Sequence, residues 1–487
     1  MAHPPLQPAE RTDSARAGRP HERGAAGPLQ QPIERIGPCR AGRPAQHRDA
    51  LHPRQSVHRL PPRGLARNPV HRPRTPRPPL LRVAAAAGAA ARKPRAYRLR
   101  GPRPILRTRR SRAGATPHLV TCCPGARGTR GGHSVNHEFN ELQELLGQTA
   151  REFFSRDFPL DRMRDGYRND DGYDTELWPN IVDLGWNSAP FPEEMGGTGG
   201  GLFDTVLLLE EMGKGYCVSP YPHSTIAAGL PLVEADADLA QAIADGEAVV
   251  IPALTAAEGG PAQEAARGDG DAVTLTDRRL VVPWAELATH LLVPLADGDE
   301  MAVVETGADG VSAAQMPSSG GEPLSDVRFE GAAGRVVSAA GLQDTVTLLG
   351  AIANSVLMLG LCQRSLELAS EYSKTRVAFG KPIGTFQAIS HKCANMVVDI
   401  ETGRNLCYKA AWLHSTGQPY EMGARYAKAF MGDATARITR DAIQVHGGVG
   451  FIDDHFVQFP YRIGTAAACT YGTAHEHRRA VASAILD

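Results

Sequence analysis

Residues 376–387 read Arg-Val-Ala-Phe-Gly-Lys-Pro-Ile-Gly-Thr-Phe-Gln, and they separate two long helical patterns. Two glycines and one proline interrupt the helical period, so this stretch predicts a turn that reverses the chain. A guanidinium group can hold a phosphate through two hydrogen bonds, and a glutamine side chain can pair with an amide edge. Arg376 and Gln387 are therefore candidate ligand-binding residues, while an ordinary helical hairpin with a surface arginine fits this stretch alone equally well.

The two flanking patterns carry apolar or small side chains at alternating spacings of four and three residues. Such spacing places each set on one face of an α-helix. The turn and its neighbours thus predict two long helices that pack against each other. The first set is Leu348, Ile352, Ser355, Leu359, Cys362 and Leu366, and the second is Ile389, Cys393, Met396, Ile400, Gly403 and Cys407.

Charge is divided unevenly along the 487 residues, although the formal net charge is zero. Residues 1–134 hold 27 Arg and one Lys against five acidic residues, a net charge of +23, so the remainder carries −23. The same segment holds 21 of the 37 prolines and a single aromatic residue, Tyr97. It cannot bury enough apolar surface to offset the entropy cost of ordering, so we expect a disordered Arg/Pro-rich arm.

Three explanations fit this arm. A basic segment can bind nucleic acid, and an Arg-rich, acid-poor segment can be a transit peptide. Arg, Pro, Ala and Gly with almost no Lys are also what GC-rich DNA yields when it is read outside its coding frame. The composition favours this third explanation, in which translation starts at Val135 and residues 1–134 are absent from the native protein. We expect no nucleic-acid binding, because the acidic remainder repels phosphate backbones.

The remaining composition argues against several classes of protein. No run approaches 18 apolar residues, so we expect no membrane span. Eight cysteines are scattered without the spacing of a metal site, and we expect no metal. Cys362, Cys393 and Cys407 lie on the apolar helix faces, which indicates reduced core residues. These features are typical of a cytoplasmic protein.

The pattern of the chain changes twice after the arm. Residues 135–247 are mostly helical, beginning with apolar side chains at helical spacing over residues 136–158. Residues 248–338 hold short segments rich in β-branched residues and separated by Gly, Asp and Pro, which predicts an antiparallel β domain. Residues 339–487 are helical again, so the fold class is α+β. The expected strands are 249–254, 272–275, 280–282, 290–293, 301–304 and 327–329.

A second unusual stretch, residues 444–451, reads Gln-Val-His-Gly-Gly-Val-Gly-Phe and ends one of the last helical patterns. Gly447 and Gly448 stop a helix and allow a ligand to approach the backbone closely. On its own, such a pair is most often a helix cap. It becomes informative only in combination with residues 376–387.

The two stretches together resemble the acyl-CoA dehydrogenase family. The first has that family's Arg-x-x-Phe-Gly-Lys-Pro-Ile-Gly-x-Phe-Gln pattern, and the second follows about 57 residues later. Residues 185–197, with Gly-Trp and a later Pro-Glu-Glu-x-Gly-Gly, are similar to the family's N-terminal domain. The resemblance covers about residues 136–487. It implies an N-terminal helical domain, a middle antiparallel β-barrel domain and a C-terminal four-helix bundle, with FAD held across a subunit interface.

The first stretch carries three of the cofactor-binding roles that the resemblance implies. Arg376 is expected to contact the FAD pyrophosphate of the neighbouring subunit, because a diphosphate favours a guanidinium partner. Phe379 is expected to pack near the adenosine part, and Gln387 to hydrogen-bond there.

Five further residues complete the implied FAD site. Gln444, Gly447 and Gly448 are expected to approach the adenine and ribose from the partner chain. Thr473 matches a family residue near the FAD phosphates. His475 stands where the family often has Gln.

The family reaction is the α,β-dehydrogenation of an acyl-CoA thioester, in which a Glu removes the α-proton while flavin N5 takes the β-hydride. The two positions where members carry that Glu align here with Tyr471 and Gly350, so the catalytic residue is unknown. Tyrosine is a poor general base at neutral pH, because its ordinary pKa is about 10. The nearby acidic residues, which we expect to be caps, surface groups or FAD-side contacts, are Asp344, Asp453, Asp454 and Glu476.

Residues 253–260 have also lost most of a family strand motif that touches flavin and substrate. Two interpretations follow. The chain is an active acyl-CoA dehydrogenase of lipid or steroid side-chain catabolism with a relocated base, or it is a non-catalytic subunit of an α2β2 heterotetramer that lends Arg376 to FAD in its partner. The implied partners are an acyl-CoA substrate, electron-transfer flavoprotein or a similar acceptor, and further subunits in a homo-oligomer or heterotetramer.

Overall fold

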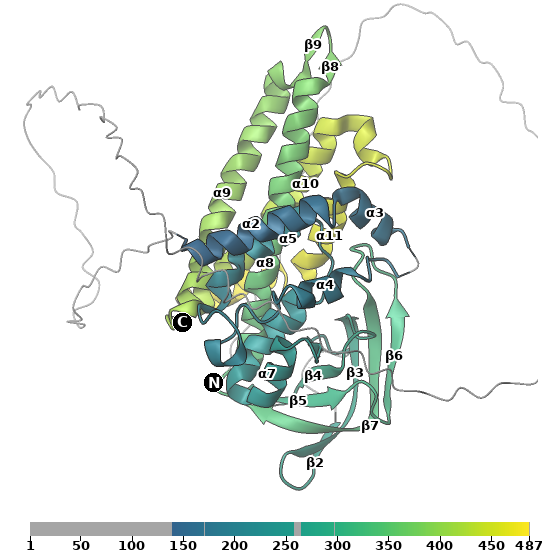
Figure 1. Cartoon of the computed structure of the whole chain (residues 1–487), viewed down its shortest axis with the longest axis vertical. Helices are drawn as coiled ribbons and strands as arrows, with labels where there is room; N and C mark the ends of the chain where they lie inside the picture. Colours follow the sequence, from purple (N-terminus) through teal and green to yellow (C-terminus); the bar gives the residue numbers. More distant parts are fainter. Residues whose placement is uncertain (1–138, 170, 258–263, 297, 487) are drawn as a thin grey trace, which may run out of the picture. The chain divides into compact units, whose positions relative to one another are not determined.

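The chain forms helices, then a sheet, then helices again, which is the order that the sequence predicts (Figure 1). The predicted arm and the proposed start at Val135 lie outside the described residues. The computed structural model describes residues 139–169, 171–257, 264–296 and 298–486.

The first part is a set of short helices that begins with α2 (Glu141–Arg156). The Asn140 side chain caps α2 by accepting from the Gln143 N–H at 2.8 Å, and the Gln143 side chain accepts from the Asn140 N–H at 2.9 Å. Two backbone donors that the helix leaves free are thus satisfied. The other elements here are α3 (Leu160–Tyr167), α4 (Leu177–Asp183), η1 (Glu193–Met195), η2 (Gly201–Thr205), α5 (Val206–Lys214), η3 (Pro222–Gly229), α6 (Leu230–Ala235) and α7 (Ala237–Ala244).

The second part is a sheet whose strands follow the order β1-β4-β5-β7-β3-β2, with β6 paired to β7. The pairs are antiparallel except for β1 with β4, which run parallel and so differ from the all-antiparallel expectation. The chain leaves β1, forms β2 and β3 at the other end of the order, and returns to β4 in the same direction. The strands are β1 (Val250–Pro252), β2 (Glu264–Arg267), β3 (Ala272–Pro283), β4 (His290–Pro294), β5 (Glu300–Glu305), β6 (Val311–Met316) and β7 (Leu324–Ser338).

The sequence pattern did not predict three details of the sheet. Strands β2 and β6 are mostly exposed and lack runs of β-branched residues, so pairing with β3 and β7 makes them strands rather than their own propensity. The segments expected at 272–275 and 280–282 are one strand, β3. Arg279 lies in the middle of it, fully buried, with its Nε 2.6 Å from Asp277.

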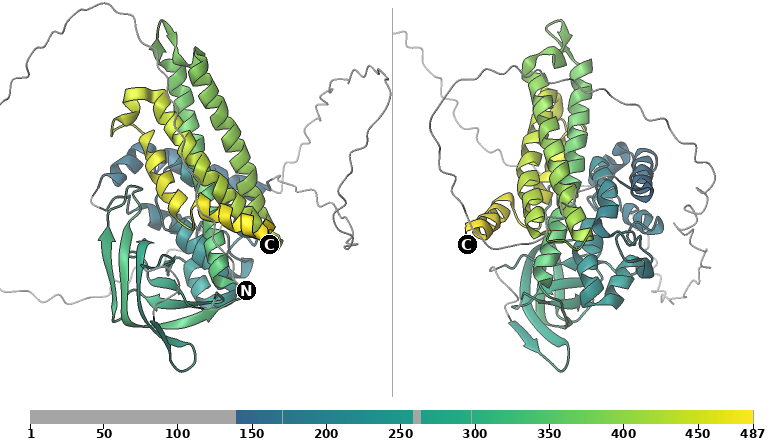
Figure 2. Two further views of the ribbon diagram at one scale, coloured as in Figure 1. Left: turned by 180° about the vertical axis from the view of Figure 1, so that it is seen from behind. Right: turned by 90° about the vertical axis from the view of Figure 1, so that its left-hand side faces the viewer.

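The third part is the helical bundle, in which α8, α9 and α10 run side by side (Figures 1 and 2). The turn predicted at residues 376–387 is confirmed as a small hairpin, β8 (Val377–Ala378) and β9 (Lys381–Pro382), followed by η4 (Ile383–Thr385). The stop predicted at Gly447 is also confirmed. The helices are α8 (Leu342–Thr375), α9 (Gln387–Ser415), α10 (Glu421–His446), η5 (Gly447–Phe451), α11 (Gln458–Cys469) and α12 (Ala474–Leu486).

Helix α8 is the central element of the bundle. By length and composition it is apolar enough to cross a membrane, but 89% of its most apolar window is buried inside the fold. It packs against α5, α9, α10 and α11. Its apolar character is therefore accounted for by contacts within this chain.

Helices α5 and α8 cross with their backbones in direct contact at Gly213 and Gly360. A Cβ at Gly360 would collide with the Glu210 carbonyl oxygen, and a Cβ at Gly213 would collide with the Leu357 carbonyl oxygen. Glycine is costly inside a helix, so its presence at both positions reflects this close approach. The crossing joins the N-terminal helices to the bundle.

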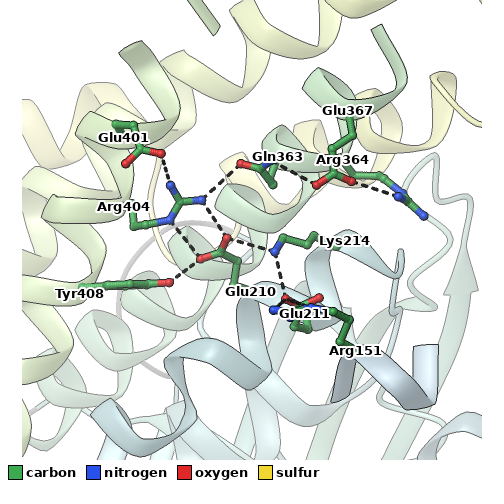
Figure 3. Close-up of polar contacts among 10 residues, drawn as sticks. All are labelled: Arg151, Glu210, Glu211, Lys214, Gln363, Arg364, Glu367, Glu401, Arg404 and Tyr408. Atoms are coloured by element: carbon green, nitrogen blue, oxygen red, sulfur yellow. Dashed lines mark hydrogen bonds and ion pairs between the residues drawn. The ribbon is translucent and has the colours of Figure 1, made fainter. Parts of the chain in front are cut away.

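A buried polar network surrounds this crossing (Figure 3). Glu210 accepts from Arg404 Nη2 at 2.9 Å and from the Tyr408 hydroxyl, and Lys214 Nζ lies 3.5 Å away. Arg404 also donates to Gln363 at 3.3 Å. Burial by itself favours the neutral form of Glu210, but the hydrogen bond and positive charge of Arg404 lower its pKa below the ordinary 4.5. The network therefore links α5, α8 and α9 through satisfied charges.

We expect Gly360→Ala to lower the free energy of unfolding by more than about 2 kcal/mol, because the new methyl meets backbone rather than a side chain that could move. Gly307→Ala is the matched control, since a Cβ there meets nothing within 4 Å. Urea unfolding of both variants measures the difference. Equal stabilities would contradict the close crossing.

Candidate active and cofactor site

The hairpin after α8 presents its predicted residues to solvent. Arg376 and Gln387 are exposed, and neither side chain makes a hydrogen bond or ion pair among the described residues. Phe379 is 95% exposed and has a φ of 52°, an uncommon backbone conformation for a residue other than glycine. These groups are available for a ligand or another chain.

The end of α10 lies beside this hairpin. The rings of Tyr372 and His446 stack with centroids 4.5 Å apart, which joins the last turns of α8 and α10. Gly447 has a φ of 61°, and a Cβ added to it or to Gly448 would meet nothing within 4 Å. Gln444 is exposed on the same last turn. The structure therefore brings the two sequence motifs to one end of the bundle.

Thr473 and His475 lie elsewhere. A Cβ at Gly432, in the middle of α10, would be 3.3 Å from the Cβ of Ala474, so these residues are next to Gly432. Gly432 is 14 residues before His446, or about 21 Å along the helix. The Thr473 N–H and hydroxyl both donate to Glu476, at 2.6 and 2.9 Å. The predicted cofactor residues thus form two separate groups.

Tyr471 and Gly350, the two positions where the family carries its Glu, are in direct contact. A Cβ at Gly350 would be 2.6 Å from the Tyr471 ring, so the ring occupies the space in front of that glycine. Ala227 and Ala351 pack with the same ring. Neither position provides a carboxylate.

Tyr471 is held by hydrogen bonds and has a left-handed backbone, with a φ of 58°. Its hydroxyl lies 2.8 Å from His223 Nδ1, and its carbonyl accepts from His477 Nε2 at 2.8 Å. Burial, and then the negative charge of Glu322, raise the pKa of Tyr471 well above its ordinary 10.0. The phenol therefore stays protonated and cannot act as a base at neutral pH.

His223 and Glu322 were missed by the sequence analysis. His223 Nε2 lies 2.6 Å from Glu322 Oε1, and the Trp284 indole N–H donates to the same oxygen at 2.8 Å. His223 is 248 residues from Tyr471 and 99 from Glu322, so no local spacing could have joined them.

The cavity beside these side chains is small, with a volume of about 30 Å³. That is room for a water molecule rather than an acyl thioester. The cavity is lined by Cys217, Val218, Ser219, Pro222, His223, Gly320, Glu322, Asn354, Leu357, Ile463, Ala466 and Ala467.

Three of the four acidic residues named in the sequence analysis have partners, and the fourth, Asp344, is exposed. Asp453 and Asp454 form ion pairs with Arg168 at 3.5 and 2.9 Å, and Glu476 caps the turn at Thr473. This agrees with the expectation that they are surface groups and caps. Among the described residues, no group of three His, Cys, Asp or Glu side chains could hold a metal ion.

Lys428 fixes the turn that carries Tyr471. It is fully buried in α10, and its Nζ donates to the Ala467 carbonyl at the end of α11. The last four carbonyls of a helix lack partners within it, so Lys428 caps α11 two residues before α11 ends. Burial lowers the pKa of Lys428 from 10.5 to about 7.

The two groups of residues differ in how well they fit FAD. Around Arg376, the free guanidinium and the open glycines suit a diphosphate and a nearby sugar. Around Thr473, the donors are already taken by Glu476, and the Tyr471 ring fills the adjacent space. The first group fits a dinucleotide, whereas the second offers it little.

This fold, with the paired motifs at one end of its bundle, is that of the acyl-CoA dehydrogenase class of proteins. Residues 140–237 match the family model "Acyl-CoA dehydrogenase, N-terminal domain", and residues 343–486 match "Acyl-CoA dehydrogenase, C-terminal domain". The chain is 30% identical to acyl-CoA dehydrogenase FadE27 of Mycobacterium tuberculosis over 302 residues, which are 58% of this chain and 80% of that protein. The chain belongs to the acyl-CoA dehydrogenase family, whose members depend on FAD.

Solved structures agree in fold. A variant of the Tcur3481–Tcur3483 steroid ACAD has a TM-score of 0.67 and 25% identity, covering 71% of this chain and 97% of that chain. The ChsE4–ChsE5 complex from Mycobacterium tuberculosis has a TM-score of 0.67 and 24% identity, covering 72% and 98%.

Lys428 predicts a specific pH dependence of stability. Between about pH 7 and 10.5 the unfolded chain keeps the lysine proton and the folded chain releases it, so this group makes the free energy of unfolding rise with pH, by at most about 1.4 kcal/mol per unit. We expect the stability of Lys428→Met relative to the wild type to be greatest near pH 7 and to decline towards pH 10. Urea unfolding at a series of pH values measures this difference. A difference that does not change with pH would contradict the lowered pKa.

Proposed function

We propose that this chain is the non-catalytic, FAD-binding subunit of a heteromeric acyl-CoA dehydrogenase. The observation that carries the proposal is the contact of the Tyr471 ring with Gly350. Both positions available for the base lack a carboxylate, and the space between them is filled by the chain's own side chains.

Removal of an α-proton requires a base within reach of the substrate and with a suitable pKa. The raised pKa of Tyr471 argues against tyrosine as that base. Glu322 is the carboxylate nearest along the hydrogen bonds, but it accepts from Trp284 and contacts His223. The geometry therefore favours the partner-subunit interpretation over an active subunit with a relocated base.

In this role the chain contributes binding rather than chemistry. Arg376 holds the pyrophosphate, Gln387 bonds to the adenosine part, and Phe379 covers it. Gly447 and Gly448 let the backbone approach the ribose. FAD held there would supply the hydride acceptor, and the partner subunit would supply the catalytic carboxylate and most of the flavin pocket.

Similarity to a steroid enzyme supports a proposal for the substrate class. The Tcur3481–Tcur3483 steroid ACAD, to which this chain is 25% identical, carries two component names. We infer a bulky acyl-CoA thioester, such as a steroid side chain or another lipid, as the substrate of the whole assembly. Electron-transfer flavoprotein or a similar acceptor removes the electrons.

Co-production tests the proposal. We expect the chain made alone to lack flavin absorbance, and the chain made with an acyl-CoA dehydrogenase encoded next to its gene to yield a yellow, active heteromer. The amount of bound FAD should increase with the amount of partner subunit that copurifies, and not with the total amount of protein. An active, flavin-loaded homo-oligomer of this chain alone would refute the proposal.

Arg376→Ala should weaken FAD retention by the heteromer, because an arginine–phosphate pair contributes a charge-assisted hydrogen bond of about 1.5–3 kcal/mol, or roughly tenfold or more in affinity. Arg156→Ala is the control, since this exposed arginine lies on α2, apart from both motifs. Flavin fluorescence after gel filtration measures the bound fraction. Unchanged retention in Arg376→Ala would remove this residue from the site.

A further inference from the structure

One chain of hydrogen bonds joins the three parts of this molecule. Tyr471 lies between the bundle helices α11 and α12, and its hydroxyl is 2.8 Å from His223 Nδ1 in η3. His223 Nε2 reaches Glu322, which precedes β7, and Glu322 accepts from Trp284, the residue that follows β3. N-terminal helices, sheet and bundle thus meet at a buried point.

The direction of these hydrogen bonds follows from the groups involved. An indole N–H only donates, and a carboxylate only accepts, so Glu322 Oε1 accepts from Trp284 and from His223 Nε2. In a neutral imidazole the other nitrogen then carries a lone pair. With the ring neutral, His223 Nδ1 accepts a hydrogen bond from the Tyr471 hydroxyl, so both ring nitrogens have a partner.

The backbone has an unusual conformation at three of the residues that these hydrogen bonds connect. Tyr471 and Trp284 both have left-handed backbones, with φ values of 58° and 56°. His223 lies in η3, a π-helix whose eight residues are all buried. Strained or rare backbone of this kind persists only where its surroundings hold it, and it is frequent at functional sites. Here the hydrogen-bonded side chains and Gly350 supply that support.

We propose that Tyr471, His223, Glu322 and Trp284 form a latch. The latch holds the N-terminal helices, the sheet and the bundle in one arrangement, and it keeps the space in front of Gly350 closed. The Tyr471 ring fills that space, and its hydroxyl fastens the ring to His223. The inference does not depend on the proposed function, because its test needs neither flavin nor substrate.

A matched pair of variants of the full chain tests the latch. Tyr471→Phe keeps the ring and removes the hydroxyl that forms the hydrogen bond with His223 Nδ1. Tyr216→Phe removes the hydroxyl of a second buried tyrosine, which also has a left-handed backbone, with a φ of 57°, but whose hydroxyl has no partner among the described residues.

We expect Tyr471→Phe to lower the midpoint of thermal unfolding by a few degrees, since it leaves a buried acceptor unpaired. Amide hydrogen exchange should rise in peptides covering residues 222–229 and 470–473. Tyr216→Phe should leave the midpoint and the exchange of both peptides unchanged or slightly improved. Equal behaviour of the two variants would overturn the latch.

Chemical rescue provides a second test. Tyr471→Gly relieves the left-handed backbone and leaves a cavity shaped like a tyrosine side chain. p-Cresol, which has the ring and the hydroxyl, should raise the unfolding midpoint of this variant and restore slow exchange in residues 222–229. Toluene, which lacks the hydroxyl, should do so less.

Equal effects of p-cresol and toluene would show that the hydroxyl does not fasten the ring, and would overturn the proposal. Should Tyr471→Gly fail to fold, the comparison of Tyr471→Phe with Tyr216→Phe decides the question by itself.

Discussion

The contact between the backbones of α5 and α8 at Gly213 and Gly360 is the constraint on which the rest of the structure depends. It places the N-terminal helices directly on the central helix of the bundle, because no side chain separates the two helices there. Glu210 then lies one turn before the crossing and reaches Arg404 of α9. The chain continues from α5 into η3, which also packs on α8 and carries His223. The position of the buried histidine is thus a consequence of a helix crossing that only glycine permits.

Helix α8 contains a second glycine that makes a different contact. At Gly360 the missing side chain admits another backbone, and at Gly350, ten residues earlier, it admits the ring of Tyr471. Any larger residue at Gly350 would compete with that ring for one space, so the two family positions for the base exclude each other here. A carboxylate at position 350 would therefore require the Tyr471 ring to move. At that position the packing of this chain, and not only the identity of one residue, keeps a base out.

Sequence patterns predicted the elements whose signals are local. Apolar periodicity identified α8 and α9, glycine and proline identified the β8–β9 hairpin, and Gly447 identified the end of α10. Strands β2 and β6 were missed because their partners, rather than their residues, make them strands. The family motifs marked Arg376 and Tyr471, whereas His223 and Glu322 belong to no motif. Their contacts with Tyr471 depend on how the N-terminal helices, the sheet and the bundle pack together. Spacing along the sequence does not reveal that packing.

The separation of the predicted cofactor residues bears on how a complete site could be assembled. The residues around Arg376 face solvent at the end of the bundle where α10 ends, whereas Thr473 lies beside Gly432, about 21 Å along α10 from His446. A flavin placed against Tyr471 would have to displace a ring held by His223 and Gly350. The exposed groups around Arg376 present no such obstacle to a dinucleotide. In the proposed heteromer the partner subunit supplies the remaining walls of that site. The exposed residues around Arg376 and the filled space at Gly350 are then compatible, because the chain completes a neighbour's site and needs no open site of its own.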